Sequence, residues 1–151
     1  MNINTYNIRF NDDRIGQLVK ETSFAYSTDE TVVDSPEKAA SLIESLWGAS
    51  NLAQEHFWLL ALDGSRKVSA AFTVTVGTLM SSLVHPRECF QRAILAGAAS
   101  IIIAHNHPSG SLDISEQDRE VTRRIRQAGD ILGIRLDDHI IIADGGFVSA
   151  Y

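Results

Sequence analysis

A short apolar segment that ends in two histidines places the tightest constraint on the fold of this chain. Residues 100–104, Ser-Ile-Ile-Ile-Ala, are rich in β-branched side chains and contain no charged residue. This pattern is typical of a central strand that is buried on both faces. Because such a strand needs packed layers around its sheet, the chain is predicted to pack helices against a sheet.

Three further segments have the spacing of apolar residues that predicts amphipathic helices. They cover residues 34–47, residues 85–98 and residues 115–134. The last helix should be interrupted or end at Gly129 or Gly133. The side chains expected to face inward are Ala39, Leu42, Ile43 and Leu46 in the first helix, and Phe90, Ile94 and Leu95 in the second.

Strands are predicted between these helices. Residues 57–62 and 67–75 should form a hairpin whose turn chemistry comes from Asp63-Gly64. Additional strands are expected over residues 78–84, 136–144 and 147–151. The fold class is therefore α/β (mixed α+β), with a central mixed β-sheet flanked by three helices, in one domain over 35–151. Residues 1–34 are either an edge hairpin or a partner-binding arm, and the sequence leaves both open.

Composition limits the partners and the compartment. A formal net charge of −6 argues against broad binding to nucleic acid, which needs a basic face. The arginines at 119, 123, 124 and 126 form a local exception that a solvated helix face explains. The N-terminus has no pattern of a secretory signal and no apolar stretch is long enough to span a bilayer, so a cytoplasmic protein without membrane contact is expected.

The histidines that follow the apolar strand indicate chemistry. His105 and His107 project to the same side of an extended backbone, and Asp118 lies in the first turn of the next predicted helix. Two imidazoles and a carboxylate can hold a catalytic zinc ion. The alternative is that Ser115 and Asp118 form a capping box, which would leave the two histidines unexplained.

The segment His105 to Asp118, HNHPSGSLDISEQD, resembles the JAMM signature of the JAB/MPN metalloproteases. With "HPRECF" and "LDDHIII", it is similar to the RadC branch of that family. The resemblance implies a JAB/MPN, cytidine-deaminase-like fold with one Zn²⁺ per chain, held by His105, His107 and Asp118. It also implies that Ser115 helps to polarise the scissile carbonyl.

The family also uses an upstream glutamate as general base. Glu55, just before a predicted strand, matches this position better than Glu88, which lies on the second predicted helix. The resemblance then implies a metallohydrolase that cleaves a peptide or isopeptide bond in a protein or peptide substrate by a metal-activated water. The alternative is a non-enzymatic module for protein interaction or DNA processing. A nuclease is less favoured because few further carboxylates are nearby.

RadC-type proteins also have an N-terminal helix-hairpin-helix region, whose glycine-rich hairpins are not visible in residues 1–34. A stand-alone domain is therefore expected, and the association of the family with DNA repair carries over by name only. Of the remaining polar residues, His139 is expected to bond to Asp137 or Asp138; the alternatives are that it contacts a metal ligand or is itself a ligand. Cys89 is placed at a helix start, where a thiol pKa can fall.

Overall fold

The computed structural model describes residues 1–77 and 84–151, which form one mixed sheet of seven strands in the order β2-β1-β4-β3-β5-β6-β7. The strands are β1 (Asn2–Phe10), β2 (Gly16–Ala25), β3 (Glu55–Leu62), β4 (Val68–Gly77), β5 (Ser100–Asn106), β6 (Arg135–Ala143) and β7 (Gly146–Ser149). The helices are α1 (Pro36–Trp47), α2 (Pro86–Leu95) and α3 (Glu116–Leu132), with 3₁₀ turns η1 (Asp29–Thr31) and η2 (Ala49–Asn51). The α/β class and the mixed sheet are as predicted. The strand expected over residues 78–84 falls almost wholly outside the described residues.

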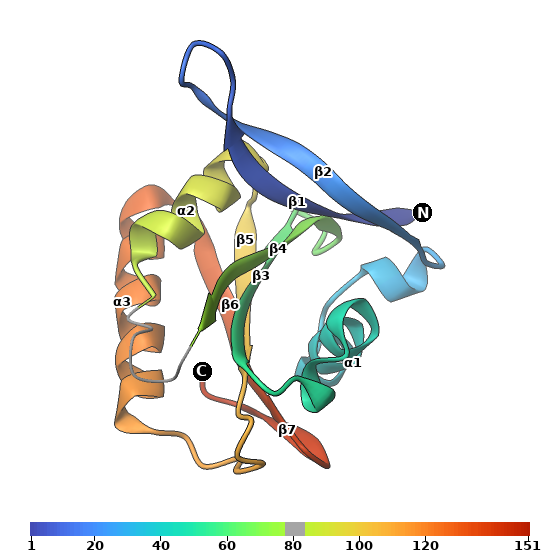
Figure 1. Cartoon of the computed structure of the whole chain (residues 1–151), viewed down its shortest axis with the longest axis vertical. Coiled ribbons are helices and arrows are strands. Elements are labelled where there is room, and N and C mark those ends of the chain that lie inside the picture. The colour runs from blue at the N-terminus through green and yellow to red at the C-terminus, as the bar shows by residue number, and fades with distance from the viewer. Residues whose placement is uncertain (78–83) are drawn as a thin grey trace.

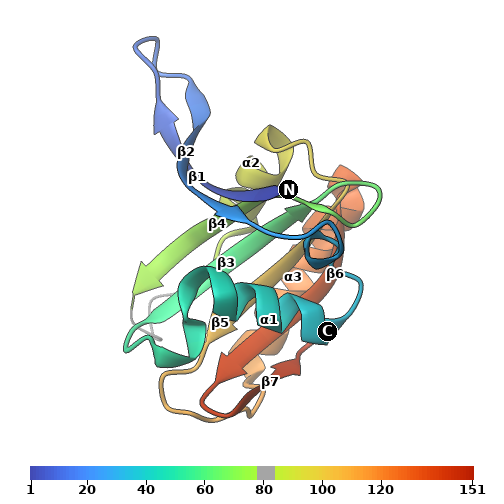
Figure 2. The same ribbon diagram turned by 90° about the vertical axis from the view of Figure 1, so that its right-hand side faces the viewer.

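Helices cover both faces of the sheet, with α1 on one side and α2 and α3 on the other (Figures 1 and 2). Strand β5 lies between them, antiparallel to β3 and parallel to β6. All seven of its residues are buried. Ile102 and Ala104 pack in the α1 layer, whereas Ile101 and Ile103 pack in the layer under α2 and α3. This alternation places His105 on the α2–α3 side and Asn106 on the α1 side.

Helix α1 follows the prediction, and α2 departs from it. In α1 the four side chains expected to face inward are all buried, and Ser35 caps the helix by accepting from the backbone N–H of Lys38 at 3.3 Å. In α2 the prediction was wrong for Ile94 and Leu95, which are 55% and 42% exposed. Phe90 is buried as predicted, together with Cys89 and Ala93.

Helix α3 ends at the second of the two predicted glycines. Gly133 adopts a left-handed conformation at φ 73° and terminates the helix. Gly129 lies inside the helix, where a Cβ would stand 2.3 Å from the carbonyl oxygen of Ile134. This glycine is therefore required by the close approach of the chain that leaves the helix, not by a turn.

The N-terminal residues form an edge hairpin, which is one of the two alternatives that the sequence left open. β1 pairs antiparallel with β2 and joins the main sheet through a parallel bridge between Thr5 and Ala71 of β4. The tip of the hairpin projects beyond the sheet (Figure 2). Among the described residues, no helix combines the length and the apolar character that crossing a membrane requires.

The predicted hairpin of β3 and β4 is present, but its turn differs in detail. Asp63 supplies the turn chemistry, because its carboxylate accepts from the backbone N–H groups of Ser65 and Lys67 at 2.8 and 3.0 Å. The left-handed residue is Arg66, at φ 64°, and not Gly64. Glu55 is the first residue of β3 and lies at the end of the sheet where β5 reaches His105.

Candidate metal centre

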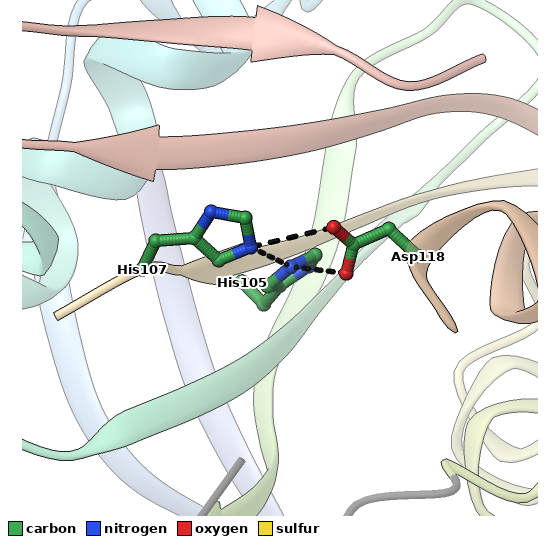
Figure 3. Close-up of side chains that lie close together, drawn as sticks. All are labelled: His105, His107 and Asp118. Carbon is green, nitrogen blue, oxygen red and sulfur yellow. Dashed lines mark hydrogen bonds and ion pairs between the residues drawn. The ribbon is translucent and has the colours of Figure 1, made fainter. Parts of the chain in front are cut away.

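Two histidines and one aspartate converge at the end of β5 (Figure 3). His105 Nε2 lies 3.0 Å from His107 Nε2 and 3.0 Å from Asp118 Oδ1, and His107 Nε2 lies 3.4 Å from Asp118 Oδ2. His105 and Asp118 are buried, and the side chain of His107 is 11% exposed. Strand β5 and the loop after it supply the histidines, and the first turn of α3 supplies the aspartate.

These spacings suit a tetrahedral metal ion. One ligand atom from each residue lies within 4.8 Å of the others, which is the condition for a shared ion. A tetrahedral zinc ion with bonds of about 2.0–2.1 Å places its ligand atoms about 3.3 Å apart. The three side chains thus have both the chemistry and the separations of a metal site, and they could hold a divalent cation without a change in backbone conformation.

The hydrogen bond of Nδ1, the nitrogen that faces away from the other two side chains, shows which nitrogen of His107 is protonated. Nδ1 lies 2.8 Å from the carbonyl oxygen of Ser111, which can only accept, so Nδ1 carries the proton. In the neutral ring, Nε2 is then a bare acceptor that faces the other two ligands. The hydrogen bond with Asp118 raises the pKa of His107 above its ordinary value, against the effect of burial. Without a metal ion, the site therefore attracts a proton.

Asp118 forms the capping box that the sequence indicated and also faces the two histidines. Its Oδ2 accepts from the backbone N–H of Ser115 at 2.8 Å, and its own N–H donates to Ser115 Oγ at 3.0 Å, which forms the capping box. Its Oδ1 remains directed at His105. Burial opposes ionisation of this carboxyl, but the hydrogen bonds with His105 and His107 outweigh it and hold the pKa of Asp118 well below its usual range. The capping box therefore fixes an ionised carboxylate beside the histidines.

A cavity of about 480 Å³ opens onto this cluster. Glu55, Glu88 and Ser115 all line it, so the structure brings both candidate general bases to the same hollow. Glu55 Oε2 is buried and has no hydrogen-bond partner among the described residues. Burial raises the pKa of Glu55, and the nearby His105 and His107 partly oppose this shift.

Asn106, between the two histidines, holds the segment that carries Glu55. Its Oδ1 accepts from the backbone N–H of His56 at 2.6 Å, and its Nδ2 donates to the carbonyl oxygen of Gln54 at 2.9 Å. The residues on both sides of Glu55 are thereby fixed to β5. No local pattern indicates this role, because the partner residues are far from Asn106 along the chain.

The backbone N–H of His139 donates to Asp138 Oδ1 at 2.8 Å, but its ring has other partners than the expected carboxylates. Its ring bonds neither Asp137 nor Asp138: Nε2 lies 2.8 Å from His105 Nδ1, and Nδ1 lies 2.7 Å from Thr122 Oγ1. Parallel pairing of β5 and β6 turns this ring into the same layer as His105. Burial, with the charge of His105, lowers the pKa of His139 to about 3, so the ring is neutral.

Cys89 also differs from the expectation. It is fully buried in α2, and burial raises the pKa of its thiol to about 12 instead of lowering it. The cost of burying a thiolate is the largest effect on this group and outweighs any stabilisation by the helix N-terminus. Cys89 is therefore an inert core residue.

Comparison with known proteins agrees with this geometry. The sequence profile described as "RadC-like JAB domain" matches residues 33–151. The chain belongs to the RadC-like JAB domain family. This RadC-like domain is 45% identical over 131 residues to a UPF0758 protein of Rubrobacter xylanophilus. The aligned residues make up 87% of the chain and 57% of that relative.

Two further relatives give similar values. The RadC-like domain is 50% identical to UPF0758 protein ABC2615 of Shouchella clausii over 78% of the chain and 50% of the relative. It is 44% identical to UPF0758 protein YsxA of Bacillus subtilis over 90% of the chain and 55% of the relative. The chain thus spans about half the length of the curated relatives it matches.

Proposed function

We propose that this chain is a zinc-dependent metallohydrolase that cleaves a peptide or isopeptide bond in a protein or peptide substrate. The observation that carries the proposal is the convergence of His105, His107 and Asp118 at a cavity that also contains the unpartnered carboxylate oxygen of Glu55. A set of two imidazoles and one carboxylate is found in catalytic zinc sites, which keep a fourth position open. A capping role for Asp118 alone leaves the two imidazoles without a purpose.

His105, His107 and Asp118 would hold the ion. Zinc in such a site supplies Lewis acidity, which makes water a better nucleophile at neutral pH and polarises a carbonyl group. The residues of the chain provide the remaining steps. Glu55 accepts the proton of the attacking water and returns it to the departing amine, as a general base and then a general acid. Its raised pKa brings the carboxyl closer to the range in which both steps are efficient.

We infer that Ser115 acts on the scissile carbonyl. Its Oγ accepts from the N–H of Asp118, and the hydroxyl proton is not used in that bond. The hydroxyl can therefore donate to the oxygen on which negative charge develops. Donors of this kind contribute on the order of 10²–10³-fold in rate. The capping box fixes Ser115 beside Asp118, so the donor and the ligand are positioned by one structural element.

Metal analysis and paired variants test the function. Protein purified without a chelator should contain about one zinc ion per chain, and His107→Ala should lose it. Glu55→Gln should keep the metal and lose on the order of 10²–10⁴-fold in peptide hydrolysis, whereas Glu88→Gln should keep both the metal and the activity. His56→Ala serves as the matched histidine control, because this ring stacks on Trp58 and lines no part of the cavity.

Two outcomes contradict the proposal. One is a protein that binds no divalent metal on reconstitution. The other is a zinc-loaded protein that cleaves no member of a peptide and isopeptide library. Incubation of the same samples with DNA tests the nuclease and accessory-module alternatives.

A further inference from the structure

The proposed chemistry does not use His139 and Thr122, which are buried beside the metal centre. His139 is 0% exposed and Thr122 is 4% exposed. The His139 ring packs against Phe57 and His105, with centroids 6.1 and 4.9 Å away. A buried polar ring needs partners for both nitrogens. The two hydrogen bonds of His139 provide these partners. With Thr122 they form a series of hydrogen bonds that starts at a main-chain carbonyl.

Which atom donates in each of these hydrogen bonds follows from the bond between Thr122 and the main-chain carbonyl. Thr122 Oγ1 lies 2.9 Å from the carbonyl oxygen of Asp118, which can only accept, so the single hydroxyl proton is committed to that bond. Thr122 Oγ1 must then accept from His139 Nδ1, at 2.7 Å. A neutral imidazole carries one proton, so His139 Nε2 is an acceptor.

The same logic reaches the metal centre. His105 Nδ1, 2.8 Å from His139 Nε2, must be the donor in that bond. In the neutral ring the other nitrogen of His105, Nε2, is then a bare acceptor that faces His107 Nε2 and Asp118 Oδ1, each at 3.0 Å. The hydrogen bond from His105 to the Asp118 carboxylate forms only when the ring carries a second proton. His107 reaches the same state by donating from Nδ1 to the carbonyl of Ser111. Both histidines thus present a lone pair to the point that Asp118 also faces.

We propose that Thr122 and His139 form a relay that fixes His105 in the Nδ1–H tautomer and so preorganises its Nε2 atom as a ligand for a divalent cation. Both are positioning residues, and the proposal rests on the metal-dependent function proposed above. The relay begins at the main-chain carbonyl of Asp118, so the turn that carries one ligand also orients another. A neutral imidazole as the outer partner adds no negative charge, unlike the carboxylates that often occupy this position.

Nitrogen-15 NMR of the histidine rings tests the tautomer directly. In metal-free wild-type protein, at a pH where both ligand histidines are neutral, His105 should show a protonated Nδ1 and an unprotonated Nε2. Thr122→Val keeps the shape of the side chain but removes the hydroxyl, so His139 can adopt either tautomer and His105 should become a mixture. Thr122→Ser keeps the hydroxyl and should retain the wild-type pattern.

Zinc affinity, measured by competition with a chelating dye, gives the second readout. His139→Leu should weaken zinc binding about 10–100-fold, and Thr122→Val about tenfold. His139→Gln should recover most of the affinity, because its amide can accept from His105 and donate to Thr122. If His139→Leu fails to fold, the pair of Thr122 variants decides the question alone.

The results separate this proposal from the hydrolase. A protonated Nε2 on His105 in the wild type, or equal zinc affinities of Thr122→Val and Thr122→Ser, would overturn the relay. Both readouts use metal-free protein or zinc alone, and neither depends on a substrate. A protein that shows the expected tautomer and affinities but cleaves no peptide would remove the hydrolase and leave the relay in place.

Discussion

Replacement of Asn106 by alanine should destabilise the protein and displace Glu55 without removing the metal ligands. The side chain is 1% exposed and makes two short hydrogen bonds, to the N–H of His56 at 2.6 Å and the carbonyl of Gln54 at 2.9 Å. A third contact, to the carbonyl of Leu52 at 3.5 Å, is weaker. Each bond is worth about 1 kcal/mol, and a buried N–H left unpaired adds to the loss.

The expected decrease in the free energy of unfolding is therefore about 2–3 kcal/mol. At about 2–4 °C per kcal/mol for a chain of this size, Tm should fall by roughly 4–12 °C. Urea denaturation and thermal melting measure both values. Asn51→Ala is the matched control, because this residue lies just before the segment that Asn106 anchors and is exposed. Its effect should stay within about 0.5 kcal/mol.

The effect on the site should be selective. Asn106 lies on the α1 side of β5 and His105 on the opposite side, so Asn106→Ala should keep its zinc affinity. Hydrolysis should fall because the residues on both sides of Glu55 lose their anchor. A loss of stability below about 1 kcal/mol would refute the hydrogen-bond argument. A loss of zinc together with activity would refute the separation of the two faces.

Three further predictions concern protonation and packing. His107 has a raised pKa, so its proton stabilises the metal-free protein at low pH, and this stabilisation disappears as the pH rises through that pKa. Because Asp118 stays ionised and His107 must lose its proton to bind metal, zinc affinity measured by calorimetry should rise about tenfold per pH unit below the pKa of His107 and then level off. A pH-independent affinity would contradict this coupling. Gly129→Ala should lower the free energy of unfolding in urea by about 1–3 kcal/mol, despite the better helix propensity of alanine, because its Cβ would meet the carbonyl of Ile134 at 2.3 Å; a stabilised variant would show that the backbone yields there. Cys89, with a thiol pKa of about 12, should resist Ellman's reagent in the native protein and react on unfolding, and rapid native labelling would contradict its burial.

Local patterns were sufficient to predict the elements whose burial follows from their own sequence. Helix α1 has an N-cap and a complete apolar stripe, and β5 is apolar throughout, so both were found. The candidate ligands were found because they lie within one short stretch that resembles a known motif. The structure brings these residues together, and whether they act as proposed is for the experiments above to decide.

Features that depend on distant parts of the chain were missed. The partners of His139 arise from pairing between β5 and β6, and those of Asn106 from pairing between β3 and β5. Ile94 has the spacing of a core residue, but the buried face of α2 runs through Cys89, Phe90 and Ala93. The sequence could not choose between an arm and a hairpin for residues 1–34, because β2 is largely exposed and carries little hydrophobic alternation.

The end of β5 makes the metal centre sensitive to strand alignment. Side chains along a strand alternate between faces, so sliding β5 by a single residue against its neighbours would exchange the surroundings of His105 and Asn106. The amide would then point at Asp118, and an imidazole at the segment before β3. Zinc uptake by a freshly refolded sample would consequently count only molecules whose strands have aligned in the native way, which makes the ion a reporter of folding fidelity.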